Sequence, residues 1–108
     1  MLSVLFAAAL FAEGRTEWVV SVPDDAARPL VYAAEELTDV IRRISGATLE
    51  MVSASGAPVR NVIRLETSGD AADDAFSVSL APDEIRLVGS SPRATLFAAH
   101  AFLRDCLD

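Results

Sequence analysis

The chain has 108 residues, of which 52% are hydrophobic, and it carries 16 acidic against 9 basic side chains. This length indicates a single domain, and the formal net charge of −7 argues against nucleic-acid or anionic-membrane partners, because phosphate binding needs clustered Lys and Arg. The single cysteine, Cys106, excludes an internal disulfide, and the sequence contains neither a phosphate-binding glycine motif nor a His-Glu-x-x-His zinc motif. We therefore expect no cofactor and no metal ion.

The chain begins with an apolar run over residues 2–12 that only Ser3 interrupts. Such a run resembles the hydrophobic region of an export signal and is too short to span a bilayer. No Lys or Arg precedes Arg15, so the basic start of a signal is missing, and a buried first strand is the alternative interpretation. The prediction is a signal peptide at residues 1–12, a folded domain at 16–108, and export to the periplasm or the extracellular space.

Residues 16–22 alternate in polarity, with Trp18, Val20 and Val22 on one side, which predicts a half-buried strand. Trp18 could stack on a sugar ring, but it shares its side of the strand with two valines. We therefore expect Trp18 to be a core residue, and we expect the same of Tyr32.

A helix is predicted to start near Asp25 or Pro29 and to end before Gly46, a residue that suits the position after a helix. Asp24 and Asp25 suit its positive end, and Asp39 and Arg43 have the i,i+4 spacing of an ion pair. One apolar stripe recurs at helical spacing and comprises Leu30, Ala33, Ala34, Leu37, Val40, Ile41 and Ile44.

Four short strands are predicted next, over residues 48–52, 61–67, 75–80 and 84–88. The tight reversal at residues 81–83 predicts that the last two strands pair as a hairpin. Phe76, Val78 and Leu80 alternate with two serines, which indicates that one face of that hairpin is exposed to water.

The final helix is predicted to begin after Gly89, with Ser90 or Ser91 as its N-cap and Pro92 in its first position. Leu96, Ala99, Leu103 and Leu107 form one apolar face, and further apolar residues surround the rest of the helix: Ala94, Phe97, Ala98, Ala101 and Phe102. We expect this helix to carry more apolar surface than its own small sheet can bury. The sequence therefore predicts that a neighbouring domain docks at Phe97, Ala101 and Phe102.

The order of the elements is β-α-β-β-β-β-α. It predicts an α+β domain with a single mixed sheet of about five strands and two helices packed on one face. The first two strands can form a crossover through the first helix if they are parallel neighbours.

The acidic pairs at residues 24–25, 35–36, 73–74 and 83–84 are the only candidates for catalysis. Neighbouring residues on a strand or helix point apart, whereas glycoside hydrolysis needs two carboxyl groups that flank one bond. Each pair also has an ordinary explanation as a helix end, a solvated face or a loop tip, so we expect no catalytic residue in this chain.

Residue spacing also argues against two other kinds of site, a catalytic Cys–His pair and a calcium-binding loop. Cys106 and His100 stand six residues apart on one predicted helix and fall on different sides of it, which argues against a nucleophile and base. The spacing of Asp70, Asp73 and Asp74 does not match a calcium loop. His100 is instead expected to be a half-buried helix residue near Arg93 and Arg104.

Two parts of the sequence resemble the N-terminal domain of bacterial α-glucuronidases of glycoside hydrolase family 67. Residues 32–37, Tyr-Ala-Ala-Glu-Glu-Leu, and residues 41–47, Ile-Arg-Arg-Ile-Ser-Gly-Ala, resemble its first helix. Residues 75–78, 84–89 and 91–98 are similar to its closing half, and the related domain before the barrel of family 20 β-hexosaminidases has the same plan. The similarity spans about residues 18–107, with one departure at Ala94, where relatives commonly have Gly.

The resemblance implies an α+β domain that precedes a (β/α)8 barrel, and the barrel holds the acidic catalytic residues. It implies a non-catalytic accessory domain of an exported glycoside hydrolase. Its partner would be the barrel of the same polypeptide, through which it would meet a polysaccharide substrate. Two alternatives remain, a module that binds a glycan by itself and a module that self-associates through the last helix.

Overall fold

The structure, a computed structural model, describes residues 18–69 and 75–107. Its elements are β1 (Val19–Val22), α2 (Arg28–Ser45), β2 (Glu50–Ser53), the short 3-10 helix η2 (Ala54–Gly56), β3 (Val62–Thr67), β4 (Phe76–Ala81), β5 (Glu84–Gly89), α3 (Pro92–Phe102) and a π-helical end, η3 (Leu103–Leu107). The predicted signal peptide and the acidic residues 70, 73 and 74 lie outside the described residues.

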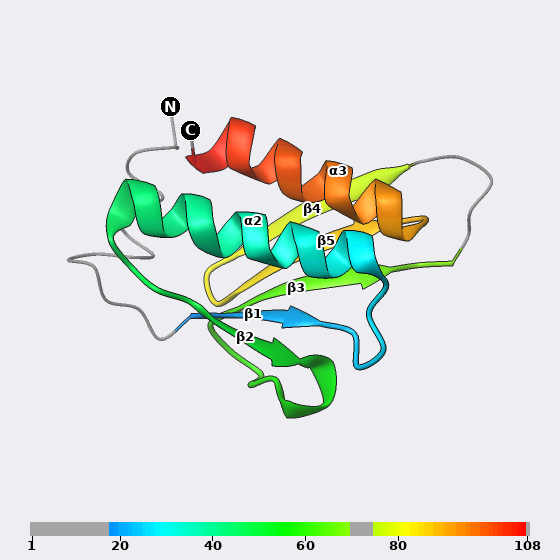
Figure 1. The fold of residues 1–108 in the computed structure, drawn as a ribbon, viewed down its shortest axis with the longest axis horizontal. Coiled ribbons are helices and arrows are strands. Elements are labelled where there is room, and N and C mark those ends of the chain that lie inside the picture. Colours follow the sequence, from blue (N-terminus) through cyan, green and yellow to red (C-terminus); the bar gives the residue numbers. More distant parts are fainter. Residues whose placement is uncertain (1–17, 70–74, 108) are drawn as a thin grey trace.

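The strands form one mixed sheet in the order β2-β1-β3-β5-β4. β1 is parallel to β2 and to β3, β3 is parallel to β5, and β4 runs antiparallel to β5 as the predicted hairpin. Figure 1 shows α2 and α3 side by side over the same face of the sheet, both starting at the same end of the domain. The predicted α+β architecture is therefore confirmed, including parallel neighbours on either side of the first helix.

The core lies between the sheet and the helix layer. Val20, Ile63 and Ile85 occupy one row of the strand register, and Leu65 and Leu87 occupy the next row on that side. All five are at most 1% exposed, as are most of the residues that α2 turns toward them. The predicted stripe of α2 is confirmed at Leu30, Ala33, Ala34, Leu37 and Ile41, whereas Ile44 at its end is 48% exposed.

The two ends of α2 agree only partly with the sequence. Gly46 has a left-handed φ of 81° and donates its N–H to the Arg42 carbonyl at 2.8 Å, as predicted for the residue after the helix. The expected acidic helix start is wrong, because the N-cap is Ala27 and the first turn contains no acidic residue. Asp24 instead accepts a hydrogen bond from the Ser55 N–H at 3.0 Å and ties the loop after β1 to η2.

The start of α3 is fixed by local signals and by a close backbone approach. Ser91 is the N-cap, and its hydroxyl accepts from the Ala94 N–H at 3.1 Å. Thr95 donates its hydroxyl to the Glu66 carbonyl at 2.7 Å, which joins the first turn of α3 to the end of β3. A Cβ at Gly89 would collide with the Thr95 backbone, so the strand can pass under the helix only with glycine at this position.

The expectation that the domain cannot cover its last helix is wrong for most of that helix, although Phe97 remains 39% exposed. Ala94, Ala98, Ala99 and Phe102 are each 0% exposed, and Ala101 is 7% exposed. Alanine on several sides lets α3 approach its neighbours closely, so α2 and the strands β3, β4 and β5 bury it from within. The α-helix also ends earlier than predicted, since the five residues of η3 have π-helical geometry.

Candidate functional site

The three acidic pairs in the described part of the chain, at residues 24–25, 35–36 and 83–84, lie on different elements, and several of their carboxylates make structural contacts. The Glu84 carboxylate accepts from the Arg64 Nε at 2.6 Å, and Asp83 lies 3.4 Å from the Arg60 guanidinium. Within residues 18–69 and 75–107, no group of three or more His, Cys, Asp or Glu side chains could hold a metal ion. Nothing in this geometry assigns a catalytic carboxyl pair.

The sheet face that the helices leave uncovered carries a charged cluster on β3 and β5. Arg64 and Arg86 are direct neighbours across these strands, an arrangement that would repel without compensation. Glu84 binds Arg64, and Glu66 accepts from the Arg86 guanidinium at 2.6 Å, so each arginine has an acidic diagonal neighbour. The hydrogen bond and charge of Glu66 raise the pKa of Arg86 above its ordinary value. The four charges compensate one another, as expected of a solvated sheet surface.

A shallow pocket of about 340 Å³ lies beside this cluster, at the carboxyl ends of β1 and β3. Its lining residues are Ser21, Pro23, Ala54, Arg64, Leu65, Glu66 and Thr67. Carboxyl ends of parallel strands are a common place for ligands. However, Arg64 is held by Glu84 and by the Pro58 carbonyl at 2.9 Å, and Glu66 is held by Arg86. The charged groups of the pocket are thus already engaged by the protein itself.

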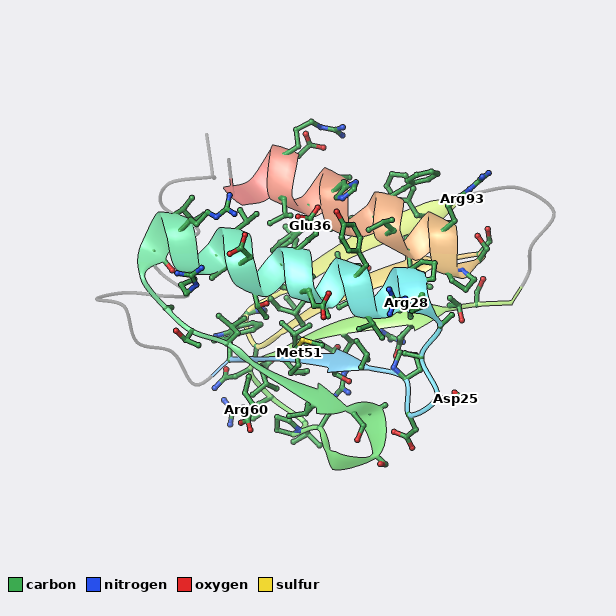
Figure 2. The ribbon with its side chains drawn as sticks, viewed as in Figure 1. Asp25, Arg28, Glu36, Met51, Arg60 and Arg93 are labelled. Atoms are coloured by element: carbon green, nitrogen blue, oxygen red, sulfur yellow. The ribbon has the colours of Figure 1, made fainter. Side chains whose placement is uncertain are left out.

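The outer surface of the helix layer is the more informative candidate. His100 of α3 lies with its Nε2 3.4 Å from the Glu36 carboxylate of α2, and Figure 2 shows the Glu36 side chain between the two helices. Tyr32 stands one turn before Glu36 on α2, and Phe97 stands about one turn before His100 on α3. Because the two helices run in the same direction, Tyr32 and Phe97 belong to the same stretch of this surface.

Both aromatic rings of this surface are open to solvent. Tyr32 is 52% exposed and Phe97 is 39% exposed. The Arg93 guanidinium lies 5.8 Å from the centre of the Phe97 ring, a cation–π distance, at the start of α3. We call these residues, together with Glu36 and His100, the outer helix surface.

The structure separates the three predicted docking residues. Phe97 belongs to the outer helix surface, whereas Ala101 and Phe102 are buried in the domain's own core and cannot meet a partner in this fold. Trp18 is 7% exposed, so its prediction as a core residue is confirmed. The same prediction for Tyr32 is wrong. Tyr32 lies outside the apolar stripe of α2 and one turn from Glu36, and this position was the available signal for its exposure.

The remaining candidates on the last helix are His100 and Cys106. His100 is about half-buried, as expected, with 47% of its side chain accessible, and its Nε2 faces the Glu36 carboxylate. The side chain of Cys106 lies outside the described part of the chain, so the structure does not relate its thiol to His100.

No protein-family model and no curated protein sequence matches this chain. In the described part of the chain, no helix is both long and apolar enough to cross a membrane.

Proposed function

We propose that this chain is a non-catalytic accessory domain of an exported glycoside hydrolase of the α-glucuronidase or β-hexosaminidase type. Its role is to dock against a catalytic (β/α)8 barrel of the same polypeptide. The proposal rests on the positions, in the structure, of the residues that resemble the glycoside hydrolase domain. Residues 32–37 and 41–47 fall on α2 and its end, and residues 84–89 and 91–98 form β5 and the start of α3.

The outer helix surface is the docking site in this proposal. Tyr32 and Phe97 are exposed aromatic side chains on one surface, and Arg93 stands beside Phe97. Aromatic and arginine side chains are enriched at the centres of protein interfaces, where they contribute most of the binding energy. Docking at this surface needs neither Ala101 nor Phe102, which the core already uses.

In this proposal, contact with a polysaccharide occurs through the barrel. The side chain best suited to stack on a sugar, Trp18, is inside the core, and Asp24, Asp83 and Glu84 of the acidic pairs make structural contacts. The chain by itself therefore binds no substrate in a reactive position.

The test is a turnover assay of the purified chain on nitrophenyl α-glucuronide and nitrophenyl β-N-acetylglucosaminide. We expect no release of nitrophenol above the blank. Turnover that Glu35→Gln with Glu36→Gln, or Asp83→Asn with Glu84→Gln, abolishes without unfolding the chain would reject the proposal.

The exposure of Tyr32 and Phe97 also favours a second candidate, a module that holds a glycan by itself by stacking on these rings. Calorimetric titration with xylohexaose and with chitohexaose separates the two. Saturable binding that Tyr32→Ala weakens would favour the glycan module. An absence of heat at millimolar oligosaccharide would leave the docking domain as the better account.

A further inference from the structure

Among residues 18–69 and 75–107, no strand covers the outer edge of β4. β4 is the last strand in the sheet order, and in the described part of the chain no strand pairs with its far side. Its six residues, Phe76–Ala81, include no charged side chain and no proline. The opposite edge strand, β2, has only four residues and begins with Glu50. Short and charged edges discourage pairing, so β4 is the edge that remains competent to add a strand.

The hydrogen-bond pattern shows which residues of β4 face outward. The Ser90 N–H donates to the Ala75 carbonyl at 2.8 Å, so Ala75 and Ser90 form a hydrogen-bonded pair. Such pairs alternate along an antiparallel ladder, which makes Ser77, Ser79 and Ala81 the residues that bond to β5. The N–H and C=O groups of Phe76, Val78 and Leu80 consequently point away from the sheet.

The side chains of β4 alternate between the two faces of the sheet. Leu80 is paired with Ile85 and Val78 with Leu87, so the apolar residues of β4 lie on the side that the helices cover. Phe76 and Leu80 are nevertheless 44% and 45% exposed. The two serines lie on the opposite, uncovered face. β4 thus reads Phe-Ser-Val-Ser-Leu, a pattern that is symmetric about Val78.

We propose that β4 pairs antiparallel with β4 of a second copy of this chain, about a two-fold axis at Val78. In this register Phe76 lies opposite Leu80 of the second copy, Val78 lies opposite its own equivalent, and Ser77 lies opposite Ser79 of the second copy. All outward backbone groups of residues 76, 78 and 80 gain partners, and apolar side chains meet apolar side chains. A register shifted by one residue would pair outward-pointing backbone groups with inward-pointing ones, and it would place two of the three apolar residues opposite serines.

This interface joins two five-stranded sheets into one continuous sheet and covers the exposed parts of Phe76 and Leu80. It is isologous, as most dimer interfaces are. One short strand and two partly exposed side chains per copy make it a small contact, and small contacts of this kind are weak and concentration-dependent. It uses neither Tyr32 nor Arg93, so it is separate from the docking surface proposed above and does not depend on it.

The first experiment measures the mass of the full chain by sedimentation equilibrium from about 1 µM to about 500 µM, a range that brackets a weak dimer. We expect a reversible monomer–dimer equilibrium. Leu80→Lys should weaken it by about tenfold or more, because an ammonium on an edge strand opposes pairing. Val59→Lys, at a residue that is 83% exposed outside β4, makes the same charge change and should have no effect. A chain that stays monomeric throughout, or a dimer that Leu80→Lys leaves unchanged, overturns the proposal.

The second experiment tests the register and remains decisive if Leu80→Lys unfolds the chain. Ser77→Cys and Ser79→Cys are made separately in chains that also carry Cys106→Ser. Residues 77 and 79 would form a non-hydrogen-bonded pair, whose Cα atoms lie about 4.5 Å apart, within the range for a disulfide. Mild oxidation of the mixture should give the mixed disulfide dimer, and either variant alone should give much less. Equal cross-linking of a single variant and of the mixture, or none in either, contradicts the proposal.

Discussion

The two phenylalanines of α3 should differ sharply in what they contribute to folding, although the sequence treats them alike. Phe102 is 0% exposed and belongs to the core cluster, whereas Phe97 keeps 39% of its surface in solvent. We expect Phe102→Ala to lower the free energy of unfolding by about 3–5 kcal/mol, because it removes the transfer energy of the ring and leaves a cavity. Phe97→Ala should cost about 1–2 kcal/mol, in proportion to the part of its ring that is covered.

Trp18 provides the assay. It is the only tryptophan of the chain and is 7% exposed, so its fluorescence reports the loss of the core. Urea unfolding with a slope of about 1–2 kcal/mol per molar should place the midpoint of Phe102→Ala about 1–3 M below that of Phe97→Ala. If Phe102→Ala is already unfolded without urea, the variant to measure instead is Phe102→Leu, which keeps most of the side-chain volume. Equal midpoints for the two alanine variants, or a lower midpoint for Phe97→Ala, would refute the assignment of Phe102 to the core.

Three further predictions follow from the β5–α3 junction and the end of the chain. Gly89→Ala should destabilise the domain by several kcal/mol in thermal unfolding, because its Cβ meets the Thr95 backbone, while Gly56→Ala, which has open space around it, should change the melting temperature little. Ser91→Ala should cost about 1 kcal/mol through the lost N-cap, measured by the same method. The hydrogen bond from Arg104 lowers the pKa of Asp105 below its usual 3.8, so Arg104→Ala should raise that pKa in an NMR titration. Since the folded-state pKa is the lower one, the contribution of this pair to stability is present above the unfolded pKa and is lost as the pH falls through the folded pKa. An unchanged Asp105 titration would show that the pair does not form in solution.

The parts of the fold that the sequence predicts well are those with local signals. The stripe of α2, the glycine after it, and the Ser91-Pro92 start of α3 are each encoded within a few residues, and all three are observed. The hairpin of β4 and β5 is likewise encoded by its tight reversal and its alternation. Such signals depend on short-range sterics and hydrogen bonds, which the rest of the chain need not determine.

The parts that were mispredicted depend on distant contacts. Helical periodicity shows that α3 is apolar on several sides, but it does not show how many neighbours surround it. In the structure α3 lies beside α2 and over three strands, so Ala101 and Phe102 are covered without a second domain. The outer helix surface could not be predicted from the sequence for the same reason. Phe97 could be named from the sequence, but its place on the same surface as Tyr32, 65 residues earlier, follows from the parallel packing of α2 and α3.

The central claim is that this domain belongs to a longer glycoside hydrolase and serves its barrel. The most direct measurement is the sequence of the gene beyond the codon for Asp108. The account predicts an open reading frame that continues into repeated strand–helix units of barrel length. A stop codon directly after Asp108 in the native gene would contradict it.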